Sequence, residues 1–273
     1  MERDRLYVLS MIKDEQRYLD EWINHYLNLG VDKIILFEDC YSKPHDISKY
    51  DINKVILHKI NDCVNEDEKK LLKSGEYRMH IVYQMFYRIY INECDWCFFV
   101  DVDEYLEYGD NIKKLLDNNF HQISFDWKTM TYSGHIKDPY PNGIYSINDT
   151  YKDYNFSIQH VKSIFNLKSN YPNWNDFKHA SNLPHSWFNN PHNNSNVKLI
   201  EGIYIKHFLT KSFDEWIHRL TQRGEVGDRW WNRKFEDFFY INDITEPLKT
   251  YLNNKIKFEQ LIVKTNEYKD NNC

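Results

Sequence analysis

The sequence predicts an α/β fold in which a mostly parallel sheet is flanked by helices. Short apolar runs that suit β-strands alternate with segments of helical period through the first hundred residues. Acidic residues gather where three of the predicted strands end. The composition agrees, because 16% of the 273 residues are aromatic and only 8 are Gly and 7 are Pro, as is typical of a globular chain.

The first hundred residues supply the alternation. Residues 6–11 form an apolar run, and residues 14–29 follow with apolar side chains at helical spacing. Gly30 stands where a glycine commonly ends a helix. The remaining predicted elements are strands over residues 31–37, 55–60 and 96–100, and a helix over residues 76–94. Strands separated by helices are typical of parallel pairing.

The pattern weakens downstream. A helix is predicted over residues 110–119 and a strand over residues 122–127. Residues 139–196 are rich in Asn, Pro, His and Tyr, which indicates an irregular insertion with brief β-like pieces such as residues 161–167. A strand over residues 199–208 and a helix over residues 212–223 come next, and residues 241–273 are expected to form a largely helical C-terminal extension.

Charge and cysteine content exclude several classes of protein. The net charge of −6 offers no basic face for nucleic acid. The five cysteines are an odd number, which favours a reducing compartment. Cys94 and Cys97 have the spacing of a redox motif, but the apolar run beside them indicates two packed thiols. A charged N-terminus and the lack of about 20 consecutive apolar residues predict a soluble, cytoplasmic protein.

The strongest chemical signal is the pair Asp101 and Asp103, which follows the apolar strand over residues 96–100. In an extended chain, side chains at i and i+2 lie on one side, so both carboxylates could share one hard divalent cation. Such a cation stabilises the charge that develops on a diphosphate when a sugar–phosphate bond breaks. The alternative is a strand-end turn with solvated acids. Two further acidic pairs, Asp14-Glu15 and Glu38-Asp39, follow the first two strands.

Several segments resemble glycosyltransferases of the family 2-like and family 92 group, and together they cover most of residues 6–240 in the same order. The resemblance implies a GT-A (Rossmann-like) fold over residues 1–240. Residues 1–125 would bind the nucleotide sugar and residues 126–240 the acceptor. The donor would be a UDP-sugar such as UDP-galactose, and the acceptor a glycan or glycolipid. The segments that carry the resemblance are residues 11–22, 29–39, 96–106, 124–135, 162–165, 205–212 and 223–224.

The resemblance also implies roles for individual residues. Asp101, Asp103 and His207 would hold Mn²⁺ or Mg²⁺, with imidazole an acceptable ligand for Mn²⁺. The family usually has Asn-Glu after the first strand where this chain has Asp14-Glu15, so the base and ribose contacts differ. For Arg78, a solvated helix face is the competing interpretation. The residues expected to contact the nucleotide sugar are Ser10, Met11, Lys13, Glu15, Glu38, Asp39, Arg78, Asp101, Val102 and Lys211.

An inverting transfer needs a base for the acceptor hydroxyl. Glu225 and Asp228 are the preferred candidates, and Asp176, His179 and His185 stay open. Aromatic side chains offer flat platforms for sugars, although core packing would explain each of them equally well. Residues 229–234 mix aromatic and cationic side chains that could also rest at a membrane surface. The residues expected to contact the acceptor are Trp127, His135, Trp187 and Trp230.

Two other functions use similar features. A sugar-phosphate nucleotidyltransferase also places paired acids at strand ends, but it usually has a glycine-rich loop after the first strand, and residues 10–18 contain no glycine. A catalytically silent carbohydrate-binding protein on the same fold would have no use for the metal ligands Asp101, Asp103 and His207. The sequence specifies neither the linkage formed nor the oligomeric state.

Overall fold

The computed structural model describes residues 4–39, 42–73, 78–130, 161–169, 196–209, 211–221, 238–239, 244 and 246–266. The chain divides into two compact units. The first comprises Met1–Lys128 and Asn155–His207, and the second comprises Thr129–Tyr154 and Phe208–Cys273. Each unit is described by itself below.

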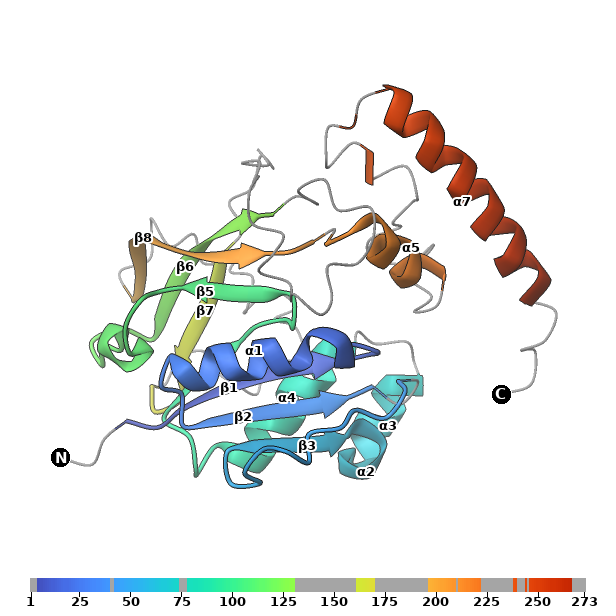
Figure 1. Ribbon diagram of the computed structural model, residues 1–273. Coiled ribbons are helices and arrows are strands. Elements are labelled where there is room, and N and C mark those ends of the chain that lie inside the picture. The colour runs from blue at the N-terminus through green and yellow to red at the C-terminus, as the bar shows by residue number, and fades with distance from the viewer. Residues whose placement is uncertain are drawn as a thin grey trace. The chain divides into compact units, whose positions relative to one another are not determined.

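The first unit is built on an eight-stranded sheet with the order β3-β2-β1-β4-β7-β6-β8-β5. Figure 1 shows β1, β2 and β3 side by side. The strands are β1 (Leu6–Ile12), β2 (Lys33–Glu38), β3 (Val55–Lys59), β4 (Trp96–Phe99), β5 (Glu104–Glu107), β6 (Gln122–Thr129), β7 (Val161–Asn166) and β8 (Val197–His207).

The sheet is mixed, so the expectation of a mostly parallel sheet is wrong. β1 pairs in parallel with β2 and β4, and β2 pairs in parallel with β3. The other half is antiparallel, because β7 pairs against β4 and β6, and β5 pairs against β8. An apolar run predicts a strand but not its direction. Between β4 and β6 the chain forms only β5 and the short 3₁₀ turn η1 (Ile112–Leu115), so this connection contains no α-helix to serve as a parallel crossover.

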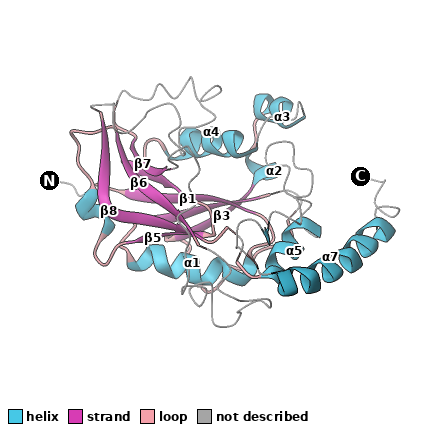
Figure 2. Ribbon diagram, turned by 90° about the horizontal axis from the view of Figure 1, so that it is seen from above, coloured by secondary structure: helices cyan, strands magenta, loops and turns pink. Residues whose placement is uncertain are grey.

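Helices cover both faces of this sheet, as predicted. On one face, α4 contributes Val82 and Phe86 to a core that includes Leu9, Phe37 and Phe99. On the other face, α1 packs the ring of Tyr26 against that of Phe98, with 6.0 Å between the centroids. Figure 2 shows α1 and α4 on opposite sides of the strands. The helices of this unit are α1 (Gln16–Asn28), α2 (Ile60–Cys63), α3 (Glu66–Lys73) and α4 (Arg78–Tyr90).

Gly30 ends α1 as predicted. Its φ is +88° and its N–H donates to the carbonyl of Leu27. A side chain at this position would also collide with Asn111, whose Nδ2 lies 2.5 Å from the place of a Cβ. Both the positive φ and the close approach require glycine.

Three local predictions differ from the structure. The helix expected over residues 110–119 is only a single 3₁₀ turn, η1 (Ile112–Leu115), because Asn111 caps it and Leu116 already has extended backbone angles. Strand β5 was not expected, because its apolar run consists only of Tyr105 and Leu106 and has an acidic residue on each side. Both apolar side chains are buried. Helices α2 and α3 were also missed, because the segment that contains them is short and strongly charged.

The described part of the second unit contains two helices, α5 (Phe213–Thr221) and α7 (Glu246–Asn266). Phe213, Trp216, Phe238 and Leu252 belong to their common core. Residues 246–266 of the predicted C-terminal extension are thus helical, and α7 shares its core with α5. Within the described residues, no helix has both the length and the apolar character needed to cross a membrane.

Candidate metal and nucleotide site

The acidic cluster after β4 forms a tight turn rather than a continued strand. The N–H of Glu104 donates to the carbonyl of Asp101 over 3.0 Å, and the N–H of Asp101 donates to Oε2 of Glu104 over 2.9 Å. The expectation that Asp101 and Asp103 share one side of an extended chain is therefore wrong. Within the turn the two carboxylates have different partners, Lys162 for Asp101 and His207 for Asp103.

Asp101 and Glu104 share a buried ammonium group. Nζ of Lys162, on β7, lies 3.0 Å from Oδ2 of Asp101 and 2.9 Å from Oε2 of Glu104. The Lys162 and Glu104 side chains are 2% and 0% exposed, whereas the Asp101 side chain is 34% exposed. Burial acts to lower the pKa of Lys162, but the carboxylates of Asp101 and Glu104 outweigh it and leave that pKa raised. Lys162 is therefore a permanent cation in the floor of the site.

Asp103 meets His207, as the resemblance implies. Nε2 of His207, the last residue of β8, lies 3.6 Å from Oδ1 of Asp103. Both side chains are nearly buried, at 8% and 7% exposure. The indole of Trp127 stacks on the imidazole, with 4.2 Å between the ring centroids and an interplanar angle of 8°. This stacking sets the plane of the His207 ring.

Strand β5 fixes the far side of the turn. It pairs with β8 in a register that places Glu104 opposite His207. Its other edge receives side chains of α1, because Trp22 Nε1 and the Tyr26 hydroxyl both donate to the carbonyl of Glu104. His25 Nε2 binds the carbonyl of Leu106 over 3.1 Å, and burial lowers the pKa of His25 to about 4. His25 is thus neutral at pH 7 and donates through Nε2.

His45 bonds both to the carboxylate of Glu38, at the end of β2, and to the main chain of Glu15, after β1. Oε1 of Glu38 accepts from both the backbone N–H and Nδ1 of His45, at 2.8 Å each. Nε2 of His45 accepts from the N–H of Glu15 over 3.0 Å. These bonds fix the neutral tautomer with its proton on Nδ1. Glu38, which is 5% exposed, is thereby occupied by the chain's own donors.

Asp14 occupies the position where the resembling family usually has Asn. Its φ is +54°, in the left-handed region that Asn and Asp tolerate best among residues with a side chain. Its Oδ1 accepts from the N–H of Lys43, and its own N–H donates to Oγ of Ser42. Asp therefore meets the same backbone requirement as Asn at this position.

The other residues expected to bind the nucleotide sugar differ in how far they are buried. Ser10 and Asp39 are buried at the carboxyl ends of β1 and β2, and Met11 and Lys13 are half-buried nearby. The side chain of Val102 is buried, at 2% exposure. Lys211 belongs to the second unit, where it is buried with a φ of +51°. Arg78 is the first residue of α4, and its side chain lies outside the described residues.

Most of the expected catalytic and acceptor residues lie outside the described part of the chain. Only Trp127 is described, and it contacts His207. Its role toward an acceptor stays a prediction, as do those of the undescribed residues, which are Glu225, Asp228, Asp176, His179, His185, His135, Trp187 and Trp230.

Sequence reasoning assigned no role to Lys162, Glu104 or His45. A signal existed for Lys162, because a lone lysine interrupts the otherwise uncharged strand β7 and all six residues of that strand are buried. A buried charge requires a partner of opposite sign. The role of His45 had no comparable signal.

The donor groups present fit a hard divalent cation in part. Asp103 and His207 offer an oxygen and a nitrogen that Mn²⁺ accepts, and Asp101 lies two residues away. Within the described ranges, no three His, Cys, Asp or Glu side chains converge as a metal cage. Mg²⁺ and Mn²⁺ sites that act on phosphates commonly use one or two protein ligands and complete the shell with water and substrate oxygens. The arrangement suits that kind of site.

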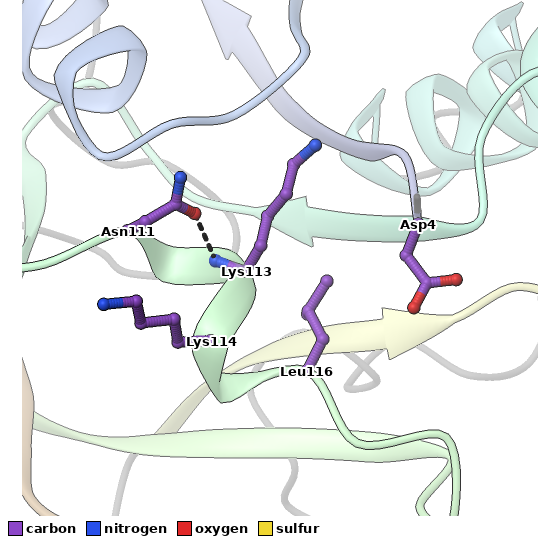
Figure 3. Close-up of a pocket in the computed structure, with 5 residues that line it drawn as sticks. All are labelled: Asp4, Asn111, Lys113, Lys114 and Leu116. Atoms are coloured by element: carbon purple, nitrogen blue, oxygen red, sulfur yellow. Dashed lines mark hydrogen bonds between the residues drawn. The ribbon is translucent and has the colours of Figure 1, made fainter. Parts of the chain in front are cut away.

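A surface cavity of about 280 Å³ lies elsewhere, lined by Asp4, Asn111, Lys113, Lys114 and Leu116 (Figure 3). Asp4 precedes β1, so the cavity lies at the amino-terminal edge of the parallel strands, opposite the edge that carries the acids. Lys113 and Lys114 already pair with Asp32 and Asp110. The cavity therefore does not belong to the candidate site.

The two packed thiols are confirmed. Cys94 and Cys97 are free and buried, and burial raises the pKa of both. Burial thus disfavours the thiolate at both positions, as expected for packed thiols.

No model of a protein family matches the sequence, and no curated protein matches it either.

Proposed function

We propose that this protein is a metal-dependent glycosyltransferase that moves a sugar from a nucleotide sugar, a UDP-sugar, to a glycan acceptor. The observation that carries the proposal is the meeting of Asp103 and His207 at 3.6 Å, with Asp101 beside them, at the carboxyl end of β4. These residues come from segments about one hundred positions apart. A βαβ half-sheet that ends in a cluster of cation ligands suits a diphosphate.

Each residue has a definite task under this proposal. Asp103 and His207 would hold Mn²⁺ or Mg²⁺, and Asp101 would complete the protein's share of the ligands. The bound cation would stabilise the negative charge of the departing nucleoside diphosphate. Trp127 keeps the His207 ring in one plane.

The remaining roles follow the resemblance to the family 2-like and family 92 glycosyltransferases and its GT-A fold. Ser10, Lys13 and Asp39 would line the nucleoside end of the site. Glu225 or Asp228 would act as base in an inverting transfer. Trp127, His135, Trp187 and Trp230 would meet a glycan or glycolipid acceptor, and UDP-galactose is the first donor to try.

The proposal predicts slow, Mn²⁺-dependent hydrolysis of UDP-sugars when no acceptor is present. Asp103→Ala is expected to lower the rate at least about a hundredfold, because a metal's charge stabilisation contributes several kcal/mol to the transition state. Release of UDP is the measurement. Asp110→Ala is the matched control, since it removes an exposed aspartate that pairs with Lys114 and accepts from the N–H of Asn111.

The possible results separate the proposal from its rivals. Hydrolysis that survives Asp103→Ala unchanged contradicts the metal role. Formation of a nucleoside triphosphate from UDP-sugar and pyrophosphate would instead indicate a nucleotidyltransferase. Saturable sugar binding without any UDP release in the presence of Mn²⁺ would indicate a catalytically silent binding protein.

A further inference from the structure

We propose that Lys162 is a positioning residue, whose ammonium holds one oxygen of Asp101 so that the other oxygen is presented to the cation. This inference rests on the proposed metal-dependent function and extends it to a residue without a previous role. Lys162 does not itself contact the ligand, because its side chain is only 2% exposed.

The contacts of Asp101 are divided between its two carboxylate oxygens. Oδ2 accepts from Nζ of Lys162 over 3.0 Å. Among the described residues, none donates a hydrogen bond to Oδ1. The Asp101 side chain is 34% exposed, far more than Asp103 or Glu104. Fixing one oxygen inside the protein leaves the other as the accessible ligand atom.

Glu104 joins the main chain of Asp101 to the same ammonium. Its Oε2 accepts from both the N–H of Asp101 and Nζ of Lys162, each over 2.9 Å. The backbone and the side chain of Asp101 are therefore tied to one buried ion pair. Because both members of that pair are almost wholly buried, they have little freedom to rearrange. This rigidity is what a precise cation site requires.

The charges agree with this interpretation. Asp101, Asp103 and Glu104 carry three carboxylates, and Lys162 carries one positive charge. Burial raises the pKa of Glu104 and the ammonium of Lys162 acts against that rise, while Asp101 and Asp103 lie close enough to add to it. A divalent cation would offset the negative charge of these carboxylates. Without Lys162 the same turn would hold three close carboxylates and repel itself.

A competing explanation is that Lys162 merely neutralises Glu104 and has no effect on the orientation of Asp101. The double variant Lys162→Met/Glu104→Gln separates the two. It removes one charge of each sign, so the net charge of the cluster is unchanged and no charge is left buried alone. The Gln carbonyl can still accept from the N–H of Asp101. The double variant loses the hold on Oδ2 of Asp101 and also the cation–π contact of Lys162 with Trp127, whose ring centroid lies 5.9 Å from Nζ. Coupling to Asp101→Asn distinguishes the two losses.

Two measurements on the full chain are needed. The first is the melting temperature of the metal-free protein. Lys162→Met alone is expected to lower it by roughly 10 °C, because the buried carboxyl of Glu104 loses its counter-ion, and the double variant is expected to recover most of that loss. The second is the Kd for Mn²⁺, obtained from the electron paramagnetic resonance signal of the free ion. The double variant is expected to bind about 10- to 100-fold more weakly than wild type.

Asp101→Asn provides the coupling test. In the wild-type background it should weaken Mn²⁺ binding clearly, whereas in the double-variant background its additional effect should be small, because Asp101 is no longer held. The inference is supported by this non-additivity together with the recovered melting temperature. A double variant that binds Mn²⁺ as tightly as wild type overturns it and leaves the proposed function standing. If wild type binds no Mn²⁺, both are overturned.

Discussion

Acids follow both β2 and β4, but the two strand ends use them differently. Glu38, the last residue of β2, accepts from the backbone N–H and the ring of His45, seven residues further on. After β4, Asp101 and Glu104 depend on Lys162, which lies about sixty residues away on β7. Asp103 depends on His207, which lies still further along the chain. The first arrangement is local, and the second needs the antiparallel half of the sheet.

This difference shows that an acid at a strand end is not by itself a ligand site. Glu38 is satisfied by donors from its own loop, and little of it is left exposed. At the end of β4, the long-range partners bind one face of the cluster and leave Asp101 accessible. The parallel half of the sheet thus fixes its loops, while the antiparallel half completes the candidate site.

The largest expected effect is at Glu104. Glu104→Leu should lower the free energy of unfolding by about 3–5 kcal/mol, because it removes one partner of a buried ion pair and leaves Lys162 poorly compensated. Urea unfolding is the measurement. Glu107→Leu is the control in the same strand, where the carboxylate is 43% exposed and pairs with Lys206, and it should cost less than about 1 kcal/mol. Equal losses in the two variants would remove the distinction between the buried and exposed acids.

Glu38→Ala should lower the free energy of unfolding by about 2–3 kcal/mol, because two donors of His45 lose their acceptor in a buried place. Glu38→Gln keeps a carbonyl oxygen at that position and should cost much less. The Kd for Mn²⁺ should not change in either variant. A weakened Mn²⁺ affinity in Glu38→Gln would instead mean that the ends of β2 and β4 act as one site.

His25 provides a test through pH, because it anchors β5 beside the candidate site. Its pKa of about 4 lies below the ordinary value of 6.5, so the unfolded chain takes up its proton first as the pH falls. The contribution of His25 to the free energy of unfolding is therefore fully present above about pH 6.5 and is lost as the pH falls toward 4. Between pH 7 and pH 5 the loss should be about 2 kcal/mol.

His25→Gln removes this titration while an amide N–H can still donate to the carbonyl of Leu106. Urea unfolding at pH 7 and pH 5 should therefore show a smaller loss of stability in the variant than in wild type, by about 2 kcal/mol. The other histidines are common to both proteins, so their titration cancels in the difference. Parallel pH profiles would show that His25 is not buried as a neutral donor.

The smallest expected effect compares two glycines, Gly30 after α1 and Gly202 in β8. Gly30 and Gly202 have φ values of +88° and +76°, so an alanine at either position is strained by about 1 kcal/mol or more. At Gly30 the new Cβ also meets the side chain of Asn111, whereas at Gly202 nothing lies within 4 Å. Gly30→Ala should therefore lose about 1 kcal/mol more stability than Gly202→Ala. Thermal unfolding of both variants measures the difference, and equal losses would mean that Asn111 moves aside freely.

The sequence predicted the elements of the parallel half closely, because each of them has a strong local signature. Amphipathic spacing predicted α1, Gly30 predicted its end, and apolar runs predicted β1 to β4. The short strand β5 escaped, since acidic residues lie at both of its ends. Helices α2 and α3 were not predicted, because their apolar residues are too few to show a helical period.

What the sequence by itself determined is that Asp101 and Asp103 follow a buried strand, in a chain whose first half alternates strands and helices. Their different partners were decided only by tertiary structure. A single turn directs Asp103 to His207 and Asp101 to Lys162, and both partners arrive on antiparallel strands whose direction and register leave no mark in an apolar run. Pairing in a sheet depends on which strands meet after folding, and the spacing of residues along one strand does not record it.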